Sequence, residues 1–236
     1  MIAFDVRHYA SITSTNDEAA RLAREGVRHG TVVHADIQTA GRGRFSRRWS
    51  SPPGNLYLSI VLRFDLPPIR IVEIGFVAAL AVADAVDAML PRMVRATLKW
   101  PNDVLVQNGK IAGILLENAD EALVLGIGVN VLQAPTGATD RVSTIVGCGG
   151  LATLDGTRTK LLAAMSDWLA VWHQDGFAAI RAAWLARAHP VGAPLSVHVA
   201  DRYVTGRFAG LEDDGALLLD TVDGPERIIA GDVQMG

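Results

Sequence analysis

Hydrophobic residues alternate with polar ones in several short stretches of this chain. Between residues 56 and 63, Leu and Ile alternate with Tyr, Ser and Arg, which predicts a strand with one buried face. Further strands are predicted at residues 31–36, 96–100, 104–106, 111–116 and 123–131. Because Asn-Gly suits a two-residue turn, Asn108-Gly109 predicts a hairpin between two of them.

Other segments follow a helical period instead. Residues 71–90, 157–173 and 177–187 predict helices. The first of these is rich in alanine but carries three acidic residues, so it is expected to be a buried amphipathic helix and not a membrane span. Near the start of the chain, Thr15 and Glu18 form a capping-box pattern that predicts a helix with Thr15 as its N-terminal cap, and Gly26 can end it.

The predicted elements change from helices to short strands near residue 190. Pro190, Gly192 and Pro194 mark a boundary, and the turn signals at 213–215 and 223–224 divide the rest into about five short strands, which suggests a small barrel. Helices interspersed with hairpins before the boundary predict an α+β domain and not a doubly wound nucleotide-binding sheet. We therefore expect a main domain at residues 1–188 and a small one at 189–236.

Composition narrows the class of protein. The chain has 236 residues, 50% of them hydrophobic and 20% charged, with a formal net charge of -3, which is typical of a globular protein without a general basic footprint for nucleic acid. The single cysteine, Cys148, excludes a disulfide framework within one chain and fits a reducing cytoplasm. The N-terminus lacks the pattern of a signal peptide, so neither a nucleic acid nor a membrane is expected as a partner.

The first candidate for chemistry is the stretch from Gln38 to Trp49. Gly41 and Gly43 let the backbone lie close to a ligand, and Arg42 and Arg44 offer planar forks for carboxylate or phosphate. Arg47, Arg48 and Trp49 add two cations and an aromatic face. A solvated basic loop is the plainer interpretation, and the stretch is not a phosphate-binding loop of the Gly-Lys-Ser/Thr kind.

A second stretch, Lys99-Trp100-Pro101-Asn102-Asp103, follows about sixty residues later. Together the two stretches point to a ligase that activates a carboxylic acid with ATP. They closely resemble motifs of the biotin protein ligases, which join biotin to a lysine of a carrier domain. The resemblance extends through nearly the whole chain and includes Ser14-Thr15-Asn16 and residues 51–56, 109–115 and 126–130.

The chain departs from that family's pattern at one place. Where the family's Arg/Gly loop has a basic residue followed by glycine, this sequence has Phe45 and Ser46.

The resemblance implies a fold and a reaction. The fold is a mixed sheet with packed helices, followed by a small SH3-like barrel. In the reaction, biotin and ATP give biotinyl-5′-AMP and pyrophosphate, and a lysine of a biotin carboxyl carrier protein then takes the biotin and releases AMP. Bringing two anions together requires cations that neutralise and align them.

The resemblance also implies roles for single residues. The catalytic residues would be Arg42, Arg44, Lys110 and Asp103. Biotin would contact Ser14, Thr15, Asn16, Gln38, Arg42, Gly43, Arg44, Lys110 and Gly113, with Gly113 leaving room for the ligand. ATP would contact Arg42, Arg44, Arg47, Trp49, Asn102, Lys110 and Asn130. Asn102 and Asp103 are the candidate oxygen ligands for Mg²⁺.

Plainer interpretations of some residues stay open. Lys110 could be a solvated hairpin lysine, Trp49 a packing residue, and the segment after Pro101 a structural turn. Asp103 could act on the incoming lysine amine in place of a metal.

Three other functions also stay open. A lipoate or octanoate ligase shares the general fold, and a catalytically silent biotin-binding protein is kept open by Phe45 and Ser46. A biotin-responsive DNA-binding repressor is disfavoured, because the ligase-like region begins almost at Met1 and leaves no space for an N-terminal helix-turn-helix. A homodimer is compatible with all of these functions.

Overall fold

The computed structural model describes residues 2–64, 67, 70–135 and 141–235. Its larger part is built on a mixed seven-stranded sheet with the strand order β1-β2-β3-β7-β6-β5-β4. The strands are β1 (Asp5–Ile12), β2 (Thr31–Gln38), β3 (Leu56–Leu62), β4 (Ala96–Lys99), β5 (Asp103–Val106), β6 (Gly109–Ala119) and β7 (Ala122–Val129). Strand β1 runs parallel to β2, and every other neighbouring pair in this sheet is antiparallel.

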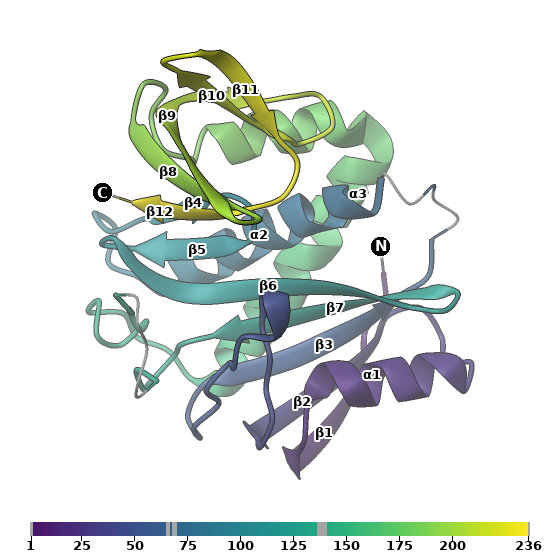
Figure 1. Ribbon diagram of the computed structural model, residues 1–236. Coiled ribbons are helices and arrows are strands. Elements are labelled where there is room, and N and C mark those ends of the chain that lie inside the picture. Colours follow the sequence, from purple (N-terminus) through teal and green to yellow (C-terminus); the bar gives the residue numbers. More distant parts are fainter. Residues whose placement is uncertain (1, 65–66, 68–69, 136–140, 236) are drawn as a thin grey trace.

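Helices cover both faces of this sheet (Figure 1). Helix α1 (Thr15–Arg24) packs its apolar side on Val33, Val61 and Val124, which point to one face. Helices α2 (Ile71–Asp87) and α3 (Leu154–Leu185) pack on each other and on the opposite face, where they form the main core. The predicted α+β architecture is therefore confirmed.

The expectation of one buried face for β3 is wrong. All seven of its residues are buried, because the strand lies in the middle of the sheet between α1 and the α2/α3 layer. Leu58 and Ile60 face the main core, whereas Ser59 and Val61 face the side of α1. The alternation indicated the strand correctly, but the face that carries Ser59 is covered by α1 and is therefore not exposed.

Two local predictions are displaced by one residue. Helix α1 is capped by Ser14, whose hydroxyl accepts a hydrogen bond from Asp17 N at 3.4 Å, and Thr15 is already helical. The turn between β5 and β6 consists of Gln107 and Asn108, with φ of 51° and 63°, and Gly109 is the first residue of β6. Each of these patterns identified the right element but not its first residue.

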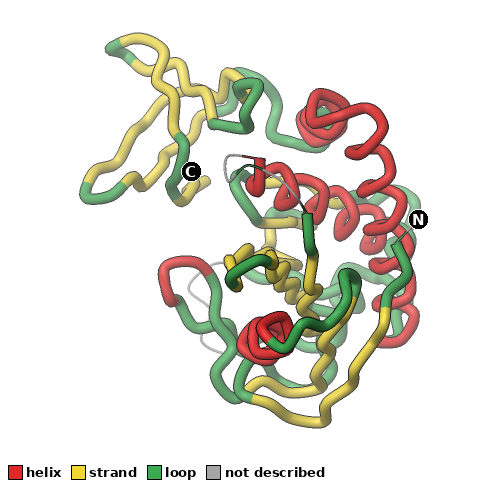
Figure 2. The backbone as a smooth tube through the Cα atoms, turned by 90° about the vertical axis from the view of Figure 1, so that its right-hand side faces the viewer, coloured by secondary structure: helices red, strands yellow, loops and turns green. Residues whose placement is uncertain are grey.

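A smaller five-stranded antiparallel sheet follows α3, as predicted (Figure 2). Its strands are β8 (Pro194–Val199), β9 (Arg202–Leu211), β10 (Leu217–Thr221), β11 (Gly224–Ile228) and β12 (Asp232–Met235). Trp100 joins the two sheets, since its buried indole donates from Nε1 to the carbonyl of Gly215 at 3.1 Å. The small sheet is thereby fixed beside β4 and β5. Among the described residues, no helix has the length and apolarity needed to cross a bilayer.

Helix α3 contains one break, at Gly176. This residue has φ 73° and ψ -175°, a conformation almost confined to glycine, and it separates the two helical segments that the sequence predicted. Apart from its chain neighbours and the nearby backbone of its own helix, no atom lies within 4 Å of the position that a Cβ would occupy, so the constraint there is conformational.

We expect Gly176→Ala to lower the free energy of unfolding by about 1–3 kcal/mol, because alanine is strained at this positive φ. Urea unfolding followed by circular dichroism measures the change. The control is Asp175→Ala, which alters the neighbouring exposed helical residue and should stay within about 0.5 kcal/mol of the unsubstituted chain. Equal stabilities of the two variants would contradict the expectation.

Candidate functional site

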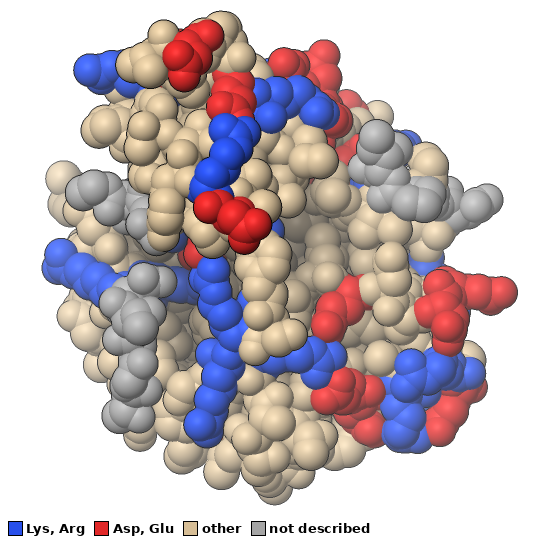
Figure 3. Space-filling view, viewed as in Figure 1, with Lys and Arg blue, Asp and Glu red and all other residues tan. Residues whose placement is uncertain are grey.

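A cavity of about 510 Å³ opens where the Arg/Gly loop crosses the sheet. Every residue predicted for the site lines it: Ser14, Thr15, Asn16, Gln38, Arg42, Gly43, Arg44, Arg47, Trp49, Asn102, Asp103, Lys110, Gly113 and Asn130. Figure 3 shows lysine and arginine side chains gathered in a column along this side of the molecule. The cavity unites residues that are far apart in sequence, while the roles assigned to them stay predictions.

Three glycines on two neighbouring strands form the floor of the cavity. A Cβ on Gly113 or Gly128 would lie 2.8 or 2.6 Å from the indole of Trp49, and a Cβ on Gly126 would overlap the amide of Asn16. Because these strands present bare backbone here, the large ring of Trp49 can lie flat against the sheet. The space beside Gly113 is thus occupied by Trp49, whereas the sequence suggested that it would be left to a ligand.

A hydrogen-bonded chain of polar side chains forms one end of the cavity. The backbone N–H and hydroxyl of Thr15 both donate to Gln38 Oε1, at 2.8 and 3.0 Å. The hydroxyl of Ser59 lies 2.7 Å from Thr15 Oγ1 and 2.5 Å from Asn16 Oδ1. All of these groups are buried or partly buried, so their orientations are fixed before any ligand binds.

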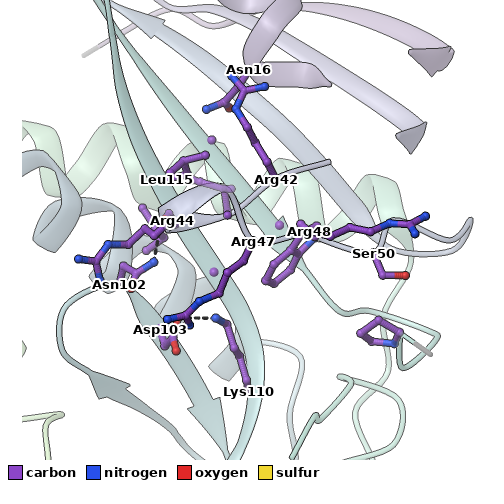
Figure 4. A pocket seen from close by; sticks show the side chains of 18 of the residues that line it. Asn16, Arg42, Arg44, Arg47, Arg48, Ser50, Asn102, Asp103, Lys110 and Leu115 are labelled. Atoms are coloured by element: carbon purple, nitrogen blue, oxygen red, sulfur yellow. Dashed lines mark hydrogen bonds and ion pairs between the residues drawn. The ribbon is translucent and has the colours of Figure 1, made fainter. Parts of the chain in front are cut away.

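Arg42 belongs to this polar end. It forms a bidentate pair with Glu117, with 3.1 and 3.0 Å between its Nε and Nη2 and the two carboxylate oxygens, and its Nη1 lies 2.6 Å from Asp17. Asn16 also donates to Glu117, at 2.6 Å. The guanidinium therefore points toward Asn16 and away from Lys110, as Figure 4 shows. Its side chain fixes the start of the loop to α1 and β6.

Cations surround a buried carboxylate at the opposite end. Asp103, 4% exposed, lies 2.6 Å from Lys110 Nζ and 3.3 Å from Lys99 Nζ. Lys110 also stands over the ring of Trp49, 5.4 Å from its centroid. The arrangement holds two ammonium groups close together, and Lys110 remains a quarter exposed toward the cavity.

Asn102 and Asp103 do not fit a protein-held Mg²⁺ site in this arrangement. Lysine ammonium groups flank both oxygens of Asp103, and Asn102 Oδ1 lies 3.4 Å from a nitrogen of Arg44. No cluster of three or more His, Cys, Asp or Glu side chains suited to a metal occurs in the described part of the chain. The oxygens that would bind a metal here are already engaged by cations.

Arg44 and Arg47 extend from the loop to the small sheet. Arg44 Nη1 donates to the carbonyl of Gly231 at 2.9 Å, and Arg47 Nη1 lies 2.6 Å from Asp232. Burial lowers the pKa of the Arg44 guanidinium, whereas the carboxylates of Asp232 and Asp103 raise it. Asp232 itself lines the cavity, so the C-terminal sheet contributes one of its walls.

Three buried polar atoms of the cavity have no hydrogen-bond partner within the described residues. Asp103 Oδ1 still has its ion pair with Lys110, whereas Trp49 Nε1, a donor, and Asn130 Oδ1, an acceptor, have no polar partner. Asn130 is 2% exposed, and its amide nitrogen donates to the carbonyl of Lys110 at 3.2 Å. Because an unpaired buried polar group is costly, both atoms indicate that this part of the cavity receives hydrogen-bonding groups from a ligand or water.

The sequence did not identify several residues of the site. Ser59, Glu117 and Asp232 were missed. Ser59 had only a weak signal, as a polar residue in a mostly apolar strand, and nothing local distinguishes Glu117 and Asp232 from other strand residues. Glu117 and Asp232 contact loop residues that are distant in the chain, and only the folded sheet brings them together.

The cavity therefore offers two environments side by side. One is a preorganised polar corner suited to a small neutral group with donors and acceptors, and the other is a cluster of arginines and lysines suited to a polyanion. A molecule carrying both a polar ring and a carboxylate, placed beside a polyphosphate, would match both ends.

Comparisons with known proteins agree with this chemistry. Residues 9–133 match the Biotin/lipoate A/B protein ligase family, and residues 197–236 match the Biotin protein ligase C terminal domain. The chain is 39% identical to a biotin–[acetyl-CoA-carboxylase] ligase of Paracoccus denitrificans, over 96% of this chain and 99% of that protein. It is 35% identical to the ligase of the same name from Mycobacterium tuberculosis, over 95% and 86%.

A solved structure extends the likeness to three dimensions. The biotin protein ligase of Aquifex aeolicus in complex with biotin and ATP matches with a TM-score of 0.84 and 28% identity, covering 98% of this chain and 97% of that one. The chain therefore belongs to the biotin/lipoate A/B protein ligase family and, within it, to the biotin protein ligases.

Proposed function

We propose that this chain is an ATP-dependent biotin–[acetyl-CoA-carboxylase] ligase, which activates biotin as biotinyl-5′-AMP and transfers it to a lysine of a biotin carboxyl carrier protein. One observation carries the proposal. A single cavity holds a preorganised polar corner at Thr15 and Gln38 and, at its other end, the cations of Arg44, Arg47 and Lys110. The named relatives and the Aquifex complex with biotin and ATP support the same reaction.

The polar corner is proposed to hold the ureido ring of biotin. That ring has one carbonyl and two N–H groups, and the corner supplies donors and acceptors from Ser14, Thr15, Asn16 and Gln38. Gly41 lies close to this corner, since a Cβ there would be 2.7 Å from the hydroxyl of Ser51, which accepts from Gln38 Nε2 at 2.9 Å. Arg42, fixed by Glu117 and Asp17, would close this end as a charged wall and leave the reacting carboxylate to the other cations.

The cation end is proposed to carry the first step. A carboxylate oxygen of biotin attacks the α-phosphorus of ATP, the bond from that phosphorus to the bridging oxygen breaks, and pyrophosphate leaves. Lys110 is proposed to neutralise both the carboxylate and the α-phosphate, and Arg44 and Arg47 would take the remaining phosphate charge. Trp49 and Asn130, with their unpartnered atoms, are proposed to contact the adenosine.

In the second step, the lysine amine of the carrier attacks the acyl carbon, the bond to the phosphate oxygen breaks, and AMP leaves. Asp103 is proposed to orient that amine and accept the proton that it loses. Mg²⁺ belongs to the proposal only as a companion of the ATP phosphates, since the protein oxygens nearby are engaged by lysine and arginine.

The organisation of the chain completes the proposal. Residues 1–188 would form the catalytic domain and residues 189–236 the C-terminal domain. A cytoplasmic location and a homodimer, each compatible with the sequence, are part of the same hypothesis.

The experiment that tests the function is pyrophosphate release from ATP and Mg²⁺, with biotin and lipoate compared in parallel. Release that depends on biotin supports the proposal. Release with lipoate alone would change the substrate, and no release by folded protein that binds biotin would indicate a silent binding protein.

We expect Lys110→Ala to lower the rate of biotinyl-5′-AMP formation by about 10²–10³-fold, because one preorganised charge at the reacting phosphate is lost. Single-turnover formation of the adenylate measures the effect. Lys160→Ala, which removes an exposed lysine on α3, serves as the matched control and should keep the full rate. A Lys110→Ala enzyme that is as fast as the control would remove Lys110 from the mechanism.

We expect Gly128→Ala to lower kcat/KM for ATP by about 10- to 100-fold, since the added methyl would lie 2.6 Å from Trp49 Nε1 and force the indole off the sheet. Steady-state kinetics and the unfolding midpoint are measured together. The matched control is Gly75→Ala in α2, where the new methyl meets only Leu116, at 3.3 Å. If both variants keep normal kinetics for ATP, the packing of Trp49 against Gly128 is not needed for ATP binding, and the expectation is wrong.

A further inference from the structure

The tip of the Arg/Gly loop is a tight turn made of unusual residues. The loop closes as a narrow hairpin, with Trp49 N donating to the carbonyl of Gly41 at 2.8 Å and Gly43 N to that of Arg47 at 2.7 Å. At its tip, Arg47 N donates to the carbonyl of Arg44 at 3.2 Å, so Phe45 and Ser46 are the two central residues of the turn.

Both central residues have positive φ, 54° for Phe45 and 56° for Ser46. Two-residue turns with this geometry strongly favour pairs such as Asn-Gly or Gly-Gly, because other side chains are strained there. Phe-Ser is a poor choice on local grounds. Side-chain interactions must therefore stabilise the loop in this conformation.

Two groups of contacts at the tip supply that stabilisation. The ring of Phe45 makes cation–π contacts with both neighbouring guanidinium groups, with Arg44 Cζ 4.8 Å and Arg47 Cζ 5.8 Å from its centroid. On the other side, Arg44 donates to Gly231 O and Arg47 pairs with Asp232. Phe45 is itself 66% exposed and buries little apolar surface, so its contribution lies in its aromatic face and not in packing.

These contacts leave the two arginines able to bind an anion. In the described part of the chain, the hydrogen bonds of Arg44 and the ion pair of Arg47 all engage Nη1. The remaining N–H groups of each planar fork stay available for phosphate oxygens. Two like charges that would repel each other are thus held close together by these contacts.

We propose that Phe45 and Asp232 are positioning residues for the triphosphate of ATP: they hold Arg44 and Arg47 at the mouth of the cavity. The identity of the ligand, ATP, rests on the proposed function. The ordering of the loop by Phe45 and Asp232 does not depend on that function. The gain is a fixed geometry of the two guanidinium groups toward the phosphates.

The test compares the unsubstituted chain with Phe45→Leu, Phe45→Tyr, Asp232→Asn and Asp220→Asn. Phe45→Leu keeps apolar volume but removes the aromatic face, and Phe45→Tyr restores that face. Asp220→Asn removes an exposed carboxylate from β10 of the same sheet and is the charge control. All three positions are outside the main core, so each of the four variants is expected to fold.

The first measurement is the KM for ATP and for biotin in pyrophosphate release. Phe45→Leu and Asp232→Asn should each raise the KM for ATP by about three- to tenfold while the KM for biotin stays unchanged. Phe45→Tyr and Asp220→Asn should stay within about twofold of the unsubstituted chain. Equal effects of Phe45→Leu and Phe45→Tyr would overturn the proposal, because the aromatic face would then be irrelevant.

The second measurement is amide hydrogen exchange of residues 42–49 in the ligand-free protein. Phe45→Leu and Asp232→Asn should speed exchange in this loop, and the two control variants should not. Unchanged exchange in the first two variants would overturn the proposal. This readout does not depend on catalysis, so it separates a failure of the positioning role from a failure of the proposed ligase activity, which would appear as no biotin-dependent pyrophosphate release by the unsubstituted chain.

Discussion

The geometry of the site depends on protein oxygens that hold several positively charged side chains close together in one cavity. Arginines and lysines crowd one cavity, and in the described structure each of the principal ones is held by an oxygen of the protein. Asp103 lies between two lysines, Glu117 and Asp17 fix Arg42, and the C-terminal sheet holds Arg44 and Arg47. Such partners offset mutual repulsion and fix geometry at the same time. They also explain why the carboxylates of this cavity are poor candidates for binding a metal.

The sequence predicts the elements of this fold well because their patterns are local. Alternation marked the strands, and the break at Gly176 separates two helices that periodicity alone distinguished. Exact starts failed where neighbouring residues are chemically equivalent: Ser14 and Thr15 can both cap a helix, and tertiary contacts decide between them. Thr15 is drawn instead into hydrogen bonds with Gln38 and Ser59.

The lining of the cavity was predictable from the sequence, but the contacts within it were not. The ordered motifs named residues that the fold brings to one cavity, yet they could not show that Trp49 lies on Gly113 and Gly128, or that Arg42 turns toward Glu117. Those facts depend on which strands are neighbours and which face each residue takes. Pairing of β6 with β7 sets Gly113 opposite Gly128, and no pattern within either segment carries that information.

The bond from Arg44 to Gly231 spans 187 residues and bears on how the protein is made. At a translation rate of about 5–20 residues per second, the loop emerges from the ribosome roughly 10–40 s before the strand that anchors it. Strands β1 to β7 contact mainly one another and can assemble during this interval. A nascent chain would thus have a nearly complete larger sheet while its cationic loop still lacks its anchor. The site would be completed only when the segment of Gly231 and strand β12 has been synthesised.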